Sequence, residues 1–289
     1  MKIHKPLIIL AFVLSLFAVF LGSRGQAFLR IQPFGDGTTL RALRSGQGSP
    51  TVVFVSGSGS PLETWVRIQP AVSGFTSTFA YDRAGLGLST RGATPRDGEH
   101  IAVELHGALH AAHVPPPYVL VGHSLGGPFI RVFAGRYSNE VAGLVLVDPT
   151  QEDLLDWAKS REGQPSSERR FRPHDEVDCA PLTFAQARKV HLPNVPVVLI
   201  SGIGPREIPS FLPAKFKSEV QRDKEVLYPA KLDFHKKWVE SLPGGRLVIT
   251  DRSGHGIPWE EPRLVVDVIR DVVARVRASS SSTIGSTKP

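Results

Sequence analysis

The sequence predicts an α/β fold in which a mostly parallel central sheet is covered by helices on both faces. Short apolar runs rich in valine, isoleucine and leucine alternate with longer segments of helical periodicity, which is the pattern of strands joined by helical crossovers. The chain has 289 residues, 41% of them hydrophobic, and one large core can be built from them. In such sheets ligands bind at the carboxyl ends of the strands, where we expect the functional residues.

The N-terminal residues predict an export signal. Lys2 and Lys5 precede the fifteen-residue run Leu7–Leu21, which holds a single serine as its polar member. Small residues near Ala27 suit a signal peptidase, so residues 1–27 are expected to direct export to a periplasmic or extracellular location and then to be removed. The alternative is a retained N-terminal membrane anchor, for which a bilayer asks for about 20 apolar residues.

Composition argues against several other functions. The formal net charge of +7 is spread along the chain without a nucleic-acid-binding motif, so no nucleic-acid partner is expected. The single cysteine, Cys179, rules out a disulfide within the chain, and no basic motif beside it marks it as a nucleophile. His106, His110 and His113 are at helical spacing but away from the apolar face, so we expect a solvated stripe and no metal.

The elements of the first half follow from turn residues, β-branched runs and helical spacing. Gly35-Asp36-Gly37 is a tight reversal between two strands. Ile101 and Leu105 share the apolar face of a helix that a run of three prolines ends. In order, we expect two strands within 28–49, a buried strand at 51–55, a short helix at 62–69 that Pro70 ends, a strand at 78–81 and a helix at 99–113.

The second half continues the alternation around one polar insertion. Residues 150–192 contain three prolines and carry seven Lys/Arg against eight Asp/Glu, which predicts a lid of irregular or short helical structure. The serine-rich residues 278–289 are expected to be a disordered tail, which leaves 28–277 as the domain. In order, we expect strands at 118–121 and 143–147 around a helix at 128–137, the lid, a strand at 195–200, helices at 215–227 and 231–242, a strand at 246–250 and a helix at 262–276.

The central feature of the sequence is the apolar run 119–121 that ends in Gly-x-Ser-x-Gly at 122–126 and is followed by a helix. Strand, sharp turn and helix are the context of a nucleophile elbow. Gly122 and Gly126 allow the close backbone packing that such a turn needs. The sequence therefore predicts Ser124 as the nucleophile, exposed at the carboxyl edge of the sheet.

A serine nucleophile needs a base and an acid. His255 follows the last predicted strand between two glycines, so it is the candidate base. Asp148 ends the strand beside the elbow, and Glu207 is the sole acid in the loop after the strand at 195–200. We favour Asp148 because a strand end holds a carboxylate more rigidly than a Gly/Pro loop, with Glu207 as the alternative and Asp251 third.

Two backbone amides are the candidate oxyanion hole. One belongs to Leu125, directly after the nucleophile, and the other to Ser58 in the Gly/Ser loop after the strand at 51–55. Gly57 lets the backbone turn toward the elbow at this point. The two donors would hold the negative charge that develops on a carbonyl oxygen under attack.

Together these motifs resemble the α/β-hydrolase fold superfamily over residues 34–277. The sequence departs from the superfamily pattern in two places. Ser56-Gly57 stands where many members have His-Gly, and the loop after the penultimate strand lacks a Gly-x-x-Asp motif. Some members carry the acid at the end of the earlier strand, which supports Asp148. The motifs that carry the resemblance lie at 56–59, 81–89, 122–127, 144–148 and 253–255.

The resemblance implies a serine hydrolase that cleaves carboxylic esters of small molecules through an acyl-enzyme, and the N-terminal signal predicts that it is exported. It implies no metal and no organic cofactor. A serine at position 124 argues against the dehalogenase and epoxide-hydrolase chemistries, which resemble this fold but use an aspartate there. Two alternatives stay open. One is a ligand-binding protein with little or no activity on a hydrolase scaffold, and the other is cofactor-free haloperoxidase-like or carbon–carbon bond hydrolase chemistry with the same residues.

Overall fold

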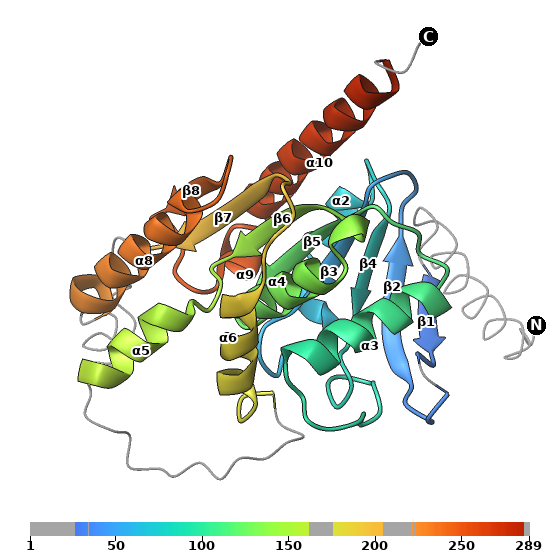
Figure 1. Cartoon of the computed structure of the whole chain (residues 1–289), viewed down its shortest axis with the longest axis horizontal. Helices are drawn as coiled ribbons and strands as arrows, with labels where there is room; N and C mark the ends of the chain where they lie inside the picture. Colours follow the sequence, from blue (N-terminus) through green and yellow to red (C-terminus); the bar gives the residue numbers. More distant parts are fainter. Residues whose placement is uncertain (1–26, 34, 162–175, 205–220, 222, 286–289) are drawn as a thin grey trace, which may run out of the picture.

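The computed structural model describes residues 27–33, 35–161, 176–204, 221 and 223–285. They form an eight-stranded sheet with helices on both faces, so the predicted fold class is confirmed (Figure 1). Every helix within the described ranges is too short or too polar to cross a bilayer. The predicted signal peptide, residues 1–27, lies outside the described residues except for Ala27, and its role stays a prediction.

The order of the strands in the sheet brings two loops side by side. The strands are β1 (Ala27–Ile31), β2 (Leu40–Ser45), β3 (Thr51–Val55), β4 (Thr78–Tyr81), β5 (Tyr118–His123), β6 (Val141–Val147), β7 (Val197–Gly202) and β8 (Arg246–Thr250). Their order is β1-β2-β4-β3-β5-β6-β7-β8, antiparallel from β1 to β4 and parallel from there on. The chain crosses from β4 over β3 to β5, so the loops after β3 and β5 leave the same carboxyl edge as neighbours.

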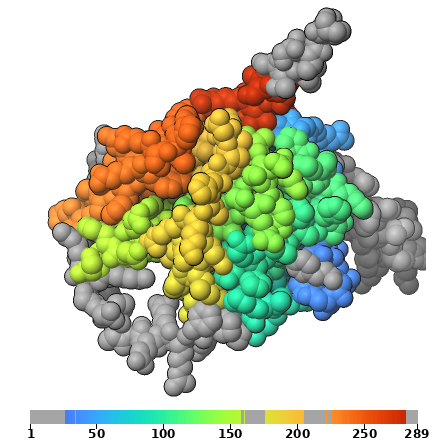
Figure 2. Space-filling view, in the orientation of Figure 1, coloured from blue at the N-terminus to red at the C-terminus, as the bar shows by residue number. Residues whose placement is uncertain are grey.

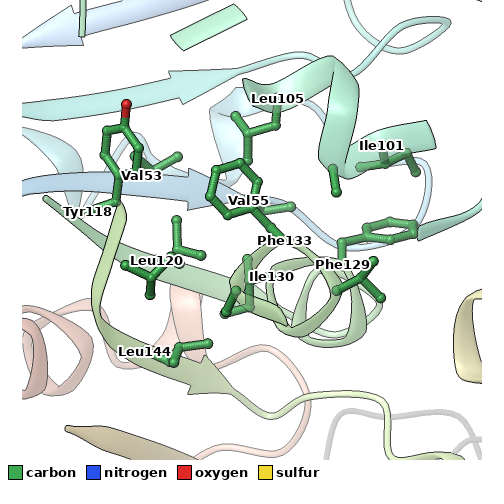
Figure 3. Packing of buried hydrophobic residues seen from close by; sticks show 14 of the residues in the cluster. Val53, Val55, Ile101, Leu105, Tyr118, Leu120, Phe129, Ile130, Phe133 and Leu144 are labelled. Carbon is green, nitrogen blue, oxygen red and sulfur yellow. The ribbon is translucent and has the colours of Figure 1, made fainter. Parts of the chain in front are cut away.

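Helices cover both faces of the sheet, and each face has its own hydrophobic core. One face carries α3 (Gly98–Ala111), α4 (Gly126–Arg136), α6 (Ala180–Lys189) and α8 (Tyr228–Glu240), and the other carries η1 (Leu62–Trp65), α2 (Gln69–Val72), α9 (Ile257–Glu260) and α10 (Pro262–Gly285). Val55 of β3 belongs to the first core and Phe54 to the second, because successive strand residues point to opposite faces. Figure 3 shows Ile130 and Phe133 of α4 beside Val55 and Leu120 in the first core.

The described part of the predicted lid at 150–192 contains two helices, and its function as a lid stays a prediction. The first, α5 (Glu152–Arg161), contacts α8. The second, α6, packs on α3, where the amide of Glu99 donates to Oε1 of Gln186 at 3.1 Å. Figure 2 shows α6 in yellow between the orange of α8 and the teal of α3. Residues 162–175 lie outside the described part of the chain.

The C-terminal helix is longer than the sequence predicts. Instead of ending at Val276, α10 continues to Gly285, so residues 278–285 are helical where we expected a disordered tail. The hydroxyls of Ser279 and Ser280 donate to carbonyls one turn back, at 3.1 and 3.0 Å. These hydroxyls are satisfied within the helix itself, so a serine-rich segment can continue a helix. Two short turns complete the fold, η2 (Ser138–Glu140) before β6 and η3 (Asp223–Leu227) before α8.

Candidate active site

A sharp turn after β5 carries Ser124 and holds it in a strained conformation. Its φ is +54°, in the left-handed region that non-glycine residues seldom adopt. A Cβ on Gly122 would lie 2.5 Å from the carbonyl oxygen of Gly126, and one on Gly126 would lie 2.3 Å from that of Val55. The turn therefore needs glycine at both positions, and its tight packing pushes the serine side chain out at the carboxyl edge.

Three predicted side chains meet at this edge in a continuous chain of hydrogen bonds. Nε2 of His255 lies 2.9 Å from Oγ of Ser124, and Nδ1 of His255 lies 2.7 Å from Oδ2 of Asp148. His255 comes from the loop between β8 and α9, and Asp148 from the end of β6. Because a carboxylate only accepts hydrogen bonds, Nδ1 carries the imidazole hydrogen and Nε2 is left to accept from the serine hydroxyl.

Asp148 is buried and fully bonded on both oxygens. Besides His255, it accepts from the amide of Gly202 at 2.9 Å and from Nζ of Lys231 at 2.9 and 3.0 Å. Burial raises the pKa of Asp148, but the hydrogen bond from His255, the charge of Lys231 and the Gly202 amide outweigh it and lower the pKa from 3.8 to about 2. The carboxylate is therefore ionised at neutral pH and stabilises positive charge on the imidazole.

Lys231 and His235 of α8 are site residues that the sequence reasoning missed. Both are buried, and with Val239 they form the inward face of a helix that looks charged throughout. His235 lies 2.9 Å from Oγ of Ser201 and 3.2 Å from the carbonyl oxygen of Pro149, and burial lowers its pKa from 6.5 to about 4. One feature of the sequence indicates this: Lys231, His235 and Val239 are spaced four residues apart, which places all three on one face of a helix.

The loop after β3 packs directly on the elbow. A Cβ on Gly57 would lie 3.0 Å from Cβ of Ser124 and 3.3 Å from Nδ1 of His123, so a side chain here would force the neighbouring side chains to shift. Among the described residues, the amides of Ser58 and Leu125 donate to no backbone acceptor in the turn, loop and cap hydrogen bonds. Two amides without a backbone acceptor, one directly after Ser124 and one in the loop packed on it, are the kind of donors that an anionic oxygen would need.

A cavity of about 590 Å³ opens beside this loop. Its walls come from the loops after β3 and β4 and from the segment before α6 in the predicted lid, and its lining includes Ser58, Gly59, Leu86, Arg91, Glu176 and Val177. It is open enough to admit a small molecule from solvent. The cavity thus adjoins Ser58, while its lining does not include Ser124, His255 or Asp148.

The structure describes all but one of the remaining sequence candidates. Glu207 is outside the described residues, and Nδ1 of His255 contacts Asp148 rather than Asp251. His106 is 3.0 Å from Oε1 of Glu140 and stacks on a tyrosine ring. The described residues contain no group of three or more His, Cys, Asp and Glu side chains that could hold a metal ion. Cys179 is buried before α6.

The comparisons with known proteins agree with the geometry at the level of the fold. A family model described as alpha/beta hydrolase fold matches residues 50–176. The uncharacterized protein YqjL of Bacillus subtilis (strain 168) is 29% identical over 233 residues, which cover 79% of this chain and 85% of that protein. The human (Lyso)-N-acylphosphatidylethanolamine lipase is 32% identical over 101 residues, 34% of this chain and 30% of the lipase.

The chain spans a smaller part of the other curated relatives, between 15% and 35% of their length. Among solved structures, a thermophilic esterase from Thermogutta terrifontis superposes with a TM-score of 0.60 at 18% identity, over 86% of this chain and 99% of that one. Likeness at this identity shows the fold alone. The family model covers the stretch from β3 past Ser124 and Asp148, and the eight-stranded, mostly parallel sheet is consistent with it, so the chain has the α/β-hydrolase fold.

Proposed function

We propose that this hydrolase-fold protein cleaves carboxylic esters of small molecules, with Ser124 as the nucleophile. The observation that carries the proposal is the unbroken chain of hydrogen bonds from Ser124 through His255 to Asp148. A serine hydroxyl attacks a carbonyl only when a base takes its proton. Here the base is in contact with the hydroxyl, and an ionised carboxylate orients the base.

In the first half of the reaction, Nε2 of His255 takes the proton of Ser124 as Oγ bonds to the ester carbonyl carbon. The carbonyl oxygen becomes an oxyanion, which the amides of Ser58 and Leu125 hold. Asp148 stabilises the imidazolium that has formed. The imidazolium then gives its proton to the alcohol oxygen as the carbon–oxygen bond breaks, and an acyl group stays on the serine.

In the second half, water replaces the alcohol. His255 takes a proton from the water as its oxygen attacks the acyl carbon, and the same two amides hold the second oxyanion. The proton returns to Oγ of Ser124 as the acyl–serine bond breaks, which releases the carboxylic acid. The imidazole is partly exposed, so water can reach it in the resting protein.

The comparisons support a hydrolase of this broad class. The human protein that is similar over part of the sequence is named a lipase. The solved structure from Thermogutta terrifontis that is similar in fold is named an esterase. The cavity beside Ser58 has room for a small acyl or alcohol group. We therefore take a small-molecule ester as the substrate class.

A labelling experiment tests the proposal. The protein is expected to hydrolyse p-nitrophenyl esters in a series of acyl chain lengths and to react covalently with a fluorophosphonate probe. Ser124→Ala is expected to abolish both, whereas Ser241→Ala, at an exposed serine after α8, leaves both unchanged. Labelling that persists in Ser124→Ala excludes Ser124 as nucleophile. A wild-type protein that binds acyl ligands but never reacts with the probe is a binding protein instead.

A further inference from the structure

One buried cation contacts the loop that carries the proposed oxyanion donor, although it touches neither Ser124 nor His255. Arg83 follows β4 and is 1% exposed. Its Nε and Nη2 donate to the two carboxylate oxygens of Glu176 at 2.6 and 2.7 Å. The guanidinium also lies over the ring of Phe129 of α4, 5.1 Å from its centroid. A planar group held on three sides has a single orientation.

Two further guanidinium hydrogens bond to the backbone of the loop after β3. Nη1 donates to the carbonyl oxygen of Ser56 and Nη2 to that of Gly57, both at 2.7 Å. These are short, charge-assisted hydrogen bonds, which are stronger than bonds between neutral groups. Arg83 therefore fixes two successive peptide groups of a loop whose sequence is rich in glycine and serine.

Fixing the carbonyl of Gly57 also fixes the amide of Ser58. Both belong to one planar peptide group, in which C=O and N–H point in opposite directions when the bond is trans. The bond between Gly57 and Ser58 is not among the cis peptides of the described chain. With the carbonyl turned to Arg83, the N–H of Ser58 is turned away from it, and this amide has no backbone acceptor among the described residues.

We infer that Arg83 is a positioning residue for the oxyanion hole and that Glu176 holds it in place. The inference rests on the proposed ester hydrolysis at Ser124. Glu176 belongs to the insertion at 150–192, so the direction of the Ser58 amide depends on a side chain of that insertion as well. Lysine cannot replace Arg83, because one ammonium cannot bind a carboxylate in bidentate fashion and two carbonyls at once.

A second buried pair provides a matched control. Arg131 binds Glu152 at 2.7 and 3.0 Å, donates to the carbonyl of Ala187 at 2.9 Å, and lies over the ring of Trp238, 4.9 Å from its centroid. The chemistry is the same, but the carbonyl belongs to α6 rather than to the loop beside Ser124. Loss of this pair is expected to lower the stability of the fold, because packing contacts and a buried ion pair are removed, without a direct effect on the oxyanion hole.

The experiment compares an ester with its thionoester, in which sulfur replaces the carbonyl oxygen and accepts hydrogen bonds weakly. The double variant Arg83→Met with Glu176→Gln leaves no unpaired charge in the core. We expect kcat for the ester to fall by about 100-fold with KM nearly unchanged, as for loss of an oxyanion donor, and the ester-to-thionoester ratio to fall at least about tenfold. Arg131→Met with Glu152→Gln is expected to keep the wild-type ratio, because unfolding lowers both rates equally.

Arg83→Lys keeps the buried positive charge beside Glu176, so it is a second variant that tests the inference if the double variant fails to fold. It is expected to lower the same ratio by several-fold, since the fork that binds both carbonyls is lost. A wild-type ratio in both Arg83 variants overturns the inference, while the proposed function stands as long as Ser124 reacts with the fluorophosphonate probe. Absence of that reaction in the wild-type protein instead defeats the proposed function itself.

Discussion

Replacement of Asp148 by asparagine separates two roles of one carboxylate. The side chain orients His255 and also neutralises Lys231, and both partners are in hydrogen-bond contact with it. Asparagine has nearly the same shape and tolerates the left-handed backbone of this position, where φ is +40°. The variant therefore removes the charge and leaves the backbone as it is.

Two magnitudes for the effect on stability are of similar size. The lowering of the pKa of Asp148 from 3.8 to about 2 corresponds to about 2 to 3 kcal/mol in favour of the ionised form. Removal of one partner of a buried ion pair costs about 3 to 5 kcal/mol, because the other charge is left unpaired. We expect Asp148→Asn to lower the free energy of unfolding by about 3 kcal/mol in urea denaturation.

The expected loss of activity is far larger than the loss of stability. An asparagine cannot hold the imidazole in the tautomer that accepts from Ser124, so kcat should fall by about 10,000-fold. Adding Lys231→Met removes the unpaired charge, and this double variant should regain stability but not activity. Glu207→Gln serves as the control with near wild-type kcat. Substantial activity in Asp148→Asn together with its loss in Glu207→Gln would refute the assignment of the acid.

Two further predictions concern packing and pH. Gly126→Ala places a Cβ 2.3 Å from the carbonyl oxygen of Val55. We therefore expect the free energy of unfolding, measured in thermal melts, to fall by roughly 1 to 3 kcal/mol, and kcat to drop at least about tenfold as the turn that carries Ser124 shifts. Full activity would show that the turn relaxes freely. Burial lowers the pKa of His123 and His235 from 6.5 to about 4, so the stability they give is present above about pH 6.5 and lost as pH falls toward about 4. His235→Gln should make the urea midpoint less sensitive to acidification from pH 7 to pH 4.5, and an unchanged pH dependence would contradict the neutral buried state.

The fold and the edge of the sheet could be predicted because their signals are local. Apolar β-branched runs identify the central strands, and Gly-x-Ser-x-Gly after such a run identifies the turn that carries Ser124. Parallel strands end at the same edge, so strand ends alone brought Asp148 and His255 into consideration. Boundaries were less secure. Pro70 was expected to end a helix, but η1 ends at Trp65 and Pro70 stands in the first turn of α2, where proline needs no hydrogen-bonding amide.

The contacts around the edge could not be predicted, because they join residues far apart in the chain. Lys231 meets Asp148 across 83 positions, from a helix whose charges look solvated in the sequence. Arg83 meets Glu176 across 93 positions, from an insertion without a legible pattern. A charged residue shows in the sequence only its type and local spacing, and the partner that justifies its burial becomes visible only when the tertiary structure is known.

Asp148 lies at the end of β6, and this position affects which parts of the chain can be varied to change substrate specificity. On the proposed assignment, β7 contributes only a main-chain donor, the amide of Gly202, to the charged group. On that assignment, residues 205–220, which follow β7, need no carboxylate for the reaction. A mutant library confined to those positions would leave the proposed proton-transfer residues Ser124, His255 and Asp148 unchanged.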